Sequence, residues 1–218
     1  MRRFLLLAFL VASTPALAQT PDRLPWFSVD LHAATVGLPQ AEGWVPVVSA
    51  DTKLPGRNWG MAVGTTVYPL KLKIITFGVG ASLITGKGTG DSSIQLGSGS
   101  TATTKATQVV HTGITSLAPQ LSMNFGHKRG WSYLSLGIGR SKVTSRSDAL
   151  ATTRGVIVPE AWNSALNFGG GAKWFMKKHL GAGFDARFVK LASRSATAVL
   201  PSAKRTQLWN ISAGISIQ

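Results

Sequence analysis

The sequence predicts an all-β protein, an eight-stranded antiparallel transmembrane β-barrel with up-and-down topology. Eight stretches alternate apolar residues with small or polar ones, and the connectors between them are alternately long and short. Bacterial transmembrane barrels follow this plan, with long connectors on one side of the membrane and tight turns on the other. The expected strands are Phe27–Gly37, Asn58–Tyr68, Ile74–Ile84, Thr115–Phe125, Trp131–Ser141, Ala165–Phe175, Leu180–Lys190 and Gln207–Ile217.

The N-terminal segment has the pattern of a bacterial export signal. Arg2 and Arg3 precede the apolar run Phe4–Ala12, and a small-residue cleavage site follows at Ala16–Ala18. The run is too short to cross a bilayer as a helix. We therefore expect export to the bacterial outer membrane. The expected domains are a signal peptide at residues 1–18 and one barrel domain at residues 19–218.

The strands have one apolar face and one face of small polar residues, because successive strand residues point to opposite sides. In Gln207–Ile217, one face holds Trp209, Ile211, Ala213, Ile215 and Ile217 and the other holds Asn210, Ser212, Gly214 and Ser216. The interior of an eight-stranded barrel is just wide enough for side chains to fill. Lipid excludes charge, because a charged side chain at the bilayer midplane costs about 2–4 kcal/mol. We expect the apolar faces to point to lipid, and we expect no large pore.

Aromatic residues lie near the strand ends, where amphipathic rings form girdles at membrane interfaces. Pro119 lies inside an expected strand, where it cannot donate to the ladder, so we expect a local bulge there. The expected girdle residues are Phe27, Trp59, Tyr68, Phe125, Trp131, Trp174, Phe188 and Trp209.

One hairpin resembles a known family. Asn167–Leu191 contains an Asn-x-Gly-x-Gly core, an aromatic pair, a tight turn and an Asp-x-Arg step at Asp185 and Arg187. It resembles the penultimate hairpin of small outer-membrane β-barrel proteins, the OmpA/OmpX-like family, and Ser135–Arg140 also looks like sequence of this family. The resemblance implies an outer-membrane barrel that is inserted by the barrel-assembly machinery. Family members usually end in an aromatic residue that this machinery reads, whereas this sequence ends in Ile217-Gln218.

Charged residues also fall on the inward faces of the expected strands. Buried charges must be paired, so we expect a lumenal network of Asp185 with Arg187 and Lys173, closed by Asp30. Its expected role is structural, because it would plug the barrel and set its register. A gated pore or proton path is the alternative.

The chain is strongly basic, with a formal net charge of +15. Export argues against nucleic acid as the partner and favours an anionic lipid, lipopolysaccharide in particular. Arginine pairs bidentately with phosphate, although ordinary solvated loop charge is equally compatible with the pattern. The Ser/Thr/Gly-rich connector Gly86–Gly113 is expected to be flexible. The residues expected to contact lipid phosphates are Arg57, Arg140, Lys142, Arg146, Arg154, Arg194, Lys204 and Arg205.

These features predict a monomeric structural or surface-interaction protein: membrane integrity, adhesion or lipopolysaccharide contact. We expect no catalytic site, cofactor or metal, because no nucleophile–base constellation is visible and His32 is the one histidine within an expected strand. Two alternatives remain. Some eight-stranded outer-membrane barrels are lipid-A-modifying enzymes, and a soluble, lipocalin-like periplasmic barrel would place its apolar faces inside.

Overall fold

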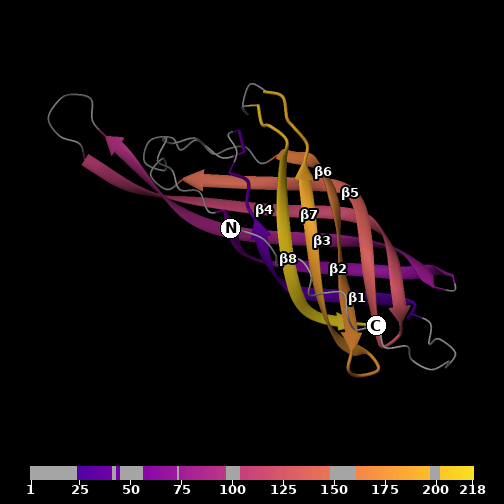
Figure 1. Cartoon of the computed structure of the whole chain (residues 1–218). Helices are drawn as coiled ribbons and strands as arrows, with labels where there is room; N and C mark the ends of the chain where they lie inside the picture. The colour runs from indigo at the N-terminus through magenta and orange to yellow at the C-terminus, as the bar shows by residue number, and fades with distance from the viewer. Residues whose placement is uncertain are drawn as a thin grey trace, which may run out of the picture.

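The computed structural model describes residues 24–40, 43–44, 56–72, 74–96, 104–147, 161–196 and 202–218. Within these residues the chain forms one closed antiparallel barrel, with its strands in chain order (Figure 1). The expected signal peptide lies outside the described residues. The strands are β1 (Phe27–Gly37), β2 (Arg57–Lys71), β3 (Ile75–Leu96), β4 (Thr104–His127), β5 (Gly130–Ser147), β6 (Ala161–Phe175), β7 (Leu180–Leu191) and β8 (Thr206–Ile217).

The ring closes between β1 and β8, which pair from Val29↔Ile217 to Val36↔Asn210. The short connectors β2–β3, β4–β5 and β6–β7 lie together at one end of the barrel, which we call the turn end. The other connectors lie at the opposite end, which we call the loop end. Part of the chain's loop-end connectors lies outside the described residues. The part of the chain that is described contains no helix long and apolar enough to cross a membrane.

The apolar faces of the strands point outward, as the alternation predicts. Leu121 is 65% exposed, and Phe184, Trp209 and Ile211 are also exposed. The opposite faces are buried in the lumen, where Ser216 is fully covered. An exterior covered with large apolar side chains is unfavourable in water and suits lipid. The barrel is therefore a transmembrane one, with lipid around its wall.

The connector Gly86–Gly113, expected to be flexible, instead extends β3 and β4. The two strands pair without interruption from Gly86↔Ile114 to Leu96↔Thr104, and only residues 97–103 between them are not described. Figure 1 shows this hairpin projecting past the other strands at the loop end. Threonine is well suited to strands, and each added pair satisfies backbone groups that a loop would leave to water.

The bulge expected at Pro119 is also absent from the described ladder. Pairs are missing at Ala118 and Pro119, but β4 and β5 keep one register on either side, from Leu117↔Arg140 to Gln120↔Gly137. The ladder therefore tolerates the missing N–H locally. The register instead shifts in the β2·β3 pair, between Val67 and Leu70, on either side of Pro69.

Two residues expected in the aromatic girdles point into the barrel. Tyr68 and Trp131 are 1% and 2% exposed, respectively. Phe125 is half-buried. The remaining girdle residues are exposed on the outer wall, which agrees with the prediction for them: Phe27, Trp59, Trp174, Phe188 and Trp209.

The orientation of the wall predicts a position-dependent cost of charge. Leu136→Arg, midway along the outward face of β5 between Ser132 and Arg140, should destabilise the folded barrel by about 2–4 kcal/mol. Leu72→Arg, at the turn end, should cost about 0–1 kcal/mol, because arginine there reaches the interface. Urea unfolding in lipid vesicles measures both, and equal costs would contradict the assignment of the wall.

Candidate functional site

The lumen holds two ion pairs. Lys173 of β6 reaches across to β1, where its Nζ lies 2.6 Å from Asp30 Oδ2. On β7, Arg187 Nε lies 2.6 Å from Asp185 Oδ1. The structure thus places all four residues in the barrel interior, but it pairs Lys173 with Asp30 and not with its β7 neighbour Asp185.

Hydrogen bonds satisfy the remaining atoms of the first pair. Lys173 Nζ also donates to Ser28 Oγ at 2.9 Å, and Ser28 Oγ lies 2.8 Å from the Tyr68 hydroxyl. Ser216 Oγ donates to the second oxygen of Asp30 at 2.7 Å. The pair therefore fastens β1 to β6 and β8. Such bonds are needed because an ion pair buried without them does not recover the cost of desolvation.

The second pair is held from two other strands. The Tyr133 hydroxyl of β5 donates to Asp185 Oδ2, and Arg187 Nη1 donates to Gln120 Oε1 of β4. Arg187 Nη2 adds a hydrogen bond of 3.0 Å to Asp185 Oδ2, so the guanidinium binds the carboxylate with two nitrogens. Two-point contacts of this kind fix geometry as well as charge.

Tyr133 joins the two pairs into one network. Lys173 Nζ lies 5.2 Å from the centroid of the Tyr133 ring, within the range of a cation–π contact. The same ring donates its hydroxyl to Asp185. We call the residues Asp30, Lys173, Tyr133, Asp185 and Arg187 the lumenal network.

An aromatic cap closes the lumen at the turn end. Trp131 stacks on Phe175 with centroids 5.0 Å apart, and Tyr68 meets Trp131 edge-on at 6.0 Å. Leu24, which precedes β1, packs against this cluster. Tyr68 and Trp131, which were expected in an outer girdle, therefore fill the lumen instead. For Trp131 the parity of β5 contains the signal, because this residue shares the face of Tyr133 and of the buried Ser135.

The loop end of the lumen is filled by apolar side chains. Val36, Ile84, Ile114 and Val189 are among the buried members of one cluster that also includes Trp44. Between this cluster and the aromatic cap, a cavity of about 20 Å³ adjoins the lumenal network. That volume corresponds to about one water molecule. The barrel interior is thus a packed core, as expected for eight strands.

His32 is buried in the same core. Its Nδ1 lies 3.2 Å from Ser212 Oγ, and its Nε2 has no hydrogen-bond partner among the described residues. A serine beside a histidine is the start of a nucleophilic site, but only a cavity of about 20 Å³ adjoins this one. No cluster of metal-binding side chains occurs among the described residues.

Two of the basic residues expected to contact lipid are bound to the protein itself. The Arg57 guanidinium lies 3.0 Å from the Trp209 ring centroid. Arg194 Nη2 donates to Gly43 O at 2.7 Å, and its guanidinium lies 5.2 Å from the Trp44 ring. Partial burial lowers the pKa of Arg194. The contacts of Arg194 join the segments that follow β1 and β7.

The remaining expected residues differ in position. Arg140, Lys204 and Arg205 are exposed at the loop end. Lys142 is half-buried and makes an interaction within the protein. Arg146 lies on β5, although its side chain is not described, and Arg154 lies outside the described residues.

The structure adds Lys190 to this set. A groove of about 360 Å³ runs along the outer wall at the loop end, lined by Ile138, Leu166 and Leu191 with Lys190 and Arg205 at its border. Lys190 follows Phe188 on the outward face of β7, so the alternation of that strand contained the signal.

No protein-family model matches the sequence, and a search of curated proteins finds no match. Among solved structures, the barrel is similar to Neisserial surface protein A (10% identity, 88% of this chain, 97% of that chain, TM-score 0.49). It is similar to the outer membrane protein OprG from Pseudomonas aeruginosa (11% identity, 90% and 97% covered, TM-score 0.48). It is also similar to Ail from Yersinia pestis in complex with a heparin analogue (14% identity, 87% and 97% covered, TM-score 0.47).

These similar structures are small outer-membrane β-barrel proteins, the class that the hairpin at Asn167–Leu191 resembles in sequence. The architecture of the present chain follows from its own strand pairs, which close the ring independently of any comparison.

The lumenal network predicts that removal of a single buried carboxylate strongly lowers folding stability. Asp185→Ala leaves Arg187 without its partner inside the barrel, which should cost about 3–5 kcal/mol of folding stability. The double variant Asp185→Leu with Arg187→Met removes both charges and should recover most of this loss. Urea unfolding in vesicles measures both.

Ser135→Ala is a suitable control, because Ser135 is buried and its Oγ has no hydrogen-bond partner among the described residues. It should change stability little. If Asp185→Ala is as mild as this control, the buried ion pair does not hold the barrel together.

Proposed function

We propose that this protein is an outer-membrane β-barrel with a structural and surface-interaction role, and that its loop end contacts phosphates of lipopolysaccharide. The observation that carries the proposal is the position of basic side chains, two exposed and one half-buried, at the loop-end edge of the apolar wall. There they lie where acyl chains give way to charged headgroups.

Strands β5 and β7 and the residue before β8 contribute to this edge. On β5, Arg140 follows Ile138 on the outward face, and Ile138 is 74% exposed. On β7, Lys190 pairs in register with Leu166 of β6. Arg205 immediately precedes β8 and lines the same groove as Lys190. We call Arg140, Lys190 and Arg205 the rim cations.

The groove below the rim cations matches the chemistry of a phosphorylated glycolipid. Its apolar floor of Ile138 and Leu166 offers contact for acyl chains, and its border offers two cations for phosphate. Arginine adds a planar fork of donors that suits phosphate oxygens. Basic residues that only interact with water would have no reason to lie beside an apolar groove.

The filled lumen favours this role over transport or catalysis. A lipocalin-like protein needs an interior apolar cavity for its ligand, whereas here the interior apolar side chains are packed together and the cavity by the lumenal network is about 20 Å³. A lipid-A-modifying enzyme needs its nucleophile within reach of the headgroup, and the His32–Ser212 contact is buried. We therefore propose that the protein is not an enzyme.

The rim cations are tested by removing their charge. The triple variant Arg140→Gln, Lys190→Gln and Arg205→Gln should weaken binding of lipopolysaccharide to the protein held in nanodiscs of zwitterionic lipid. Each base near an anionic surface contributes about 1 kcal/mol, so affinity should fall roughly 100-fold. Binding to the unchanged protein should also weaken as salt is raised. Titration of labelled lipopolysaccharide onto the immobilised nanodiscs measures both.

A matched control loses the same charge at the other end of the barrel: Lys128→Gln, Lys177→Gln and Lys178→Gln. In nanodiscs immobilised with the loop end toward the solution, this triple should bind lipopolysaccharide as the unchanged protein does. Equal loss in both triples would show that only net charge matters, and salt-independent binding would rule out phosphate contact.

A further inference from the structure

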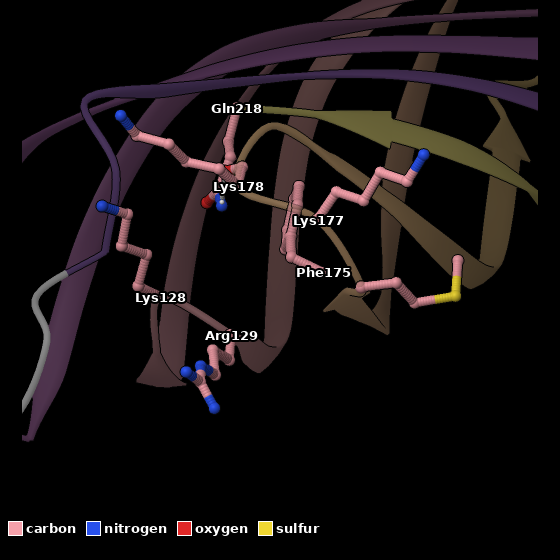
Figure 2. A pocket seen from close by; sticks show the side chains of 7 residues that line it. Lys128, Arg129, Phe175, Lys177, Lys178 and Gln218 are labelled. Atoms are coloured by element: carbon pink, nitrogen blue, oxygen red, sulfur yellow. Dashed lines mark hydrogen bonds between the residues drawn. The ribbon is translucent and has the colours of Figure 1, made fainter.

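Basic residues also gather around an opening at the turn end, where the proposed contact with lipopolysaccharide gives them no role. Lys128 and Arg129 form the β4–β5 turn, and Lys177 and Lys178 lie in the β6–β7 connector. Together with Phe175, Met176 and Gln218 they line a cup of about 500 Å³. Figure 2 shows the four basic side chains extending outward around Phe175 and Gln218. We call these four residues the turn cations.

No described side-chain carboxylate lies beside the turn cations. Among the described residues, side-chain carboxylates occur at Asp30, Asp91 and Asp185. The main-chain oxygen of Gln218, which lines the cup, lies 2.9 Å from His179 Nδ1. Asp30 and Asp185 are buried in the two lumenal ion pairs. Asp91 lies far along β3 toward the loop end, where it pairs with Val109. Four cations on one small surface, with no described side-chain carboxylate among them, repel each other, so an anionic ligand would stabilise the arrangement.

The backbone that carries the turn cations is fixed. Phe175 N donates to Arg129 O at 2.8 Å, which ties the two basic turns together, and Phe175 stacks on Trp131 of the aromatic cap. Gln218 Nε2 donates to Lys178 O at 2.8 Å, and Lys177 N donates to Leu180 O at 3.0 Å. The cup is therefore a preorganised site, which lowers the entropy cost of binding a ligand.

Exposed apolar side chains lie beside the turn cations. Met176, which adjoins Lys177, is 79% exposed, and Ile74 in the β2–β3 turn is 80% exposed. Trp26 and Leu72 at the same end are 76% and 54% exposed. A surface for a soluble acidic protein would leave these groups in water. At a membrane interface, the apolar groups enter the acyl boundary while lysine and arginine extend to the phosphates.

We propose that the cup at the turn end is a binding site for the phosphate headgroup of an anionic phospholipid in the leaflet that surrounds this end. The turn cations contact the phosphate, and Met176 contacts the upper part of an acyl chain. This inference rests on the membrane location in the proposed function, but it does not depend on contact with lipopolysaccharide.

The test counts lipids that remain bound to the full chain. The protein is purified in detergent, mixed with phosphatidylglycerol or phosphatidylcholine, and analysed by native mass spectrometry. We expect at least about tenfold preference for phosphatidylglycerol, since each base adds to attraction for an anionic lipid. The triple variant Lys128→Gln, Lys177→Gln and Lys178→Gln should lose this preference, and the rim triple Arg140→Gln, Lys190→Gln and Arg205→Gln should keep it.

Two further variants distinguish a specific headgroup site from general attraction between charges, and a separate measurement shows that each variant is folded. Lys177→Arg with Lys178→Arg keeps the charge and should retain the preference. Met176→Ser should weaken retention of phosphatidylglycerol and leave the charge unchanged. A shift in electrophoretic mobility on boiling shows that each variant is folded before it is compared.

Three outcomes would overturn the proposal. One is equal retention of the two phospholipids by the unchanged protein. Another is equal loss of preference in the rim triple. The third is displacement of phosphatidylglycerol by millimolar inorganic phosphate, which would make the cup a site for small anions. If the rim triple loses lipopolysaccharide binding while phosphatidylglycerol retention is absent, the proposed function stands and this inference falls.

Discussion

The structure depends on one constraint: in lipid, every backbone N–H and C=O must find a partner within the protein. An open sheet of strands with this apolar wall would leave two unpaired edges in hydrocarbon. Pairing of β1 with β8 removes both edges. Closure at eight strands then fixes the width of the interior, and side chains must fill it. The serine and glycine faces, the aromatic cap and the lumenal network all follow from this narrow ring.

The lumenal network fills part of this narrow interior with charged side chains, although apolar side chains could also have filled it. A buried ion pair is weak evidence of stability in itself, because desolvation offsets much of its attraction. Its geometry, however, is specific: Lys173 joins β6 to β1, and Tyr133 joins β5 to β7. Because a strand that slips by one residue turns these side chains out to lipid, the network selects one register of the ring.

The sequence predicted what depends on alternation within a strand and missed what depends on contact between strands. Parity correctly placed Leu121 outside, and it also indicated that Trp131 points inward, but the usual position of aromatic girdles was given more weight. Lys173 pairs with Asp30 across the lumen, 143 residues away in sequence, and this partner is set by the stagger of the closed ring. The extension of β3 and β4 was missed because serine, threonine and glycine suit a loop until a partner strand supplies hydrogen bonds.

The central claim is tested most directly by measuring, for each residue of one strand, whether its side chain faces lipid or the lumen. The chain contains no cysteine, so single cysteines on β8 can carry a fluorophore and report quenching by lipid-attached groups in vesicles. The account predicts strong quenching at Ile211, Ala213 and Ile215 and weak quenching at Asn210, Ser212 and Ser216. The reverse pattern, or quenching without alternation, would contradict a barrel whose apolar side chains face lipid.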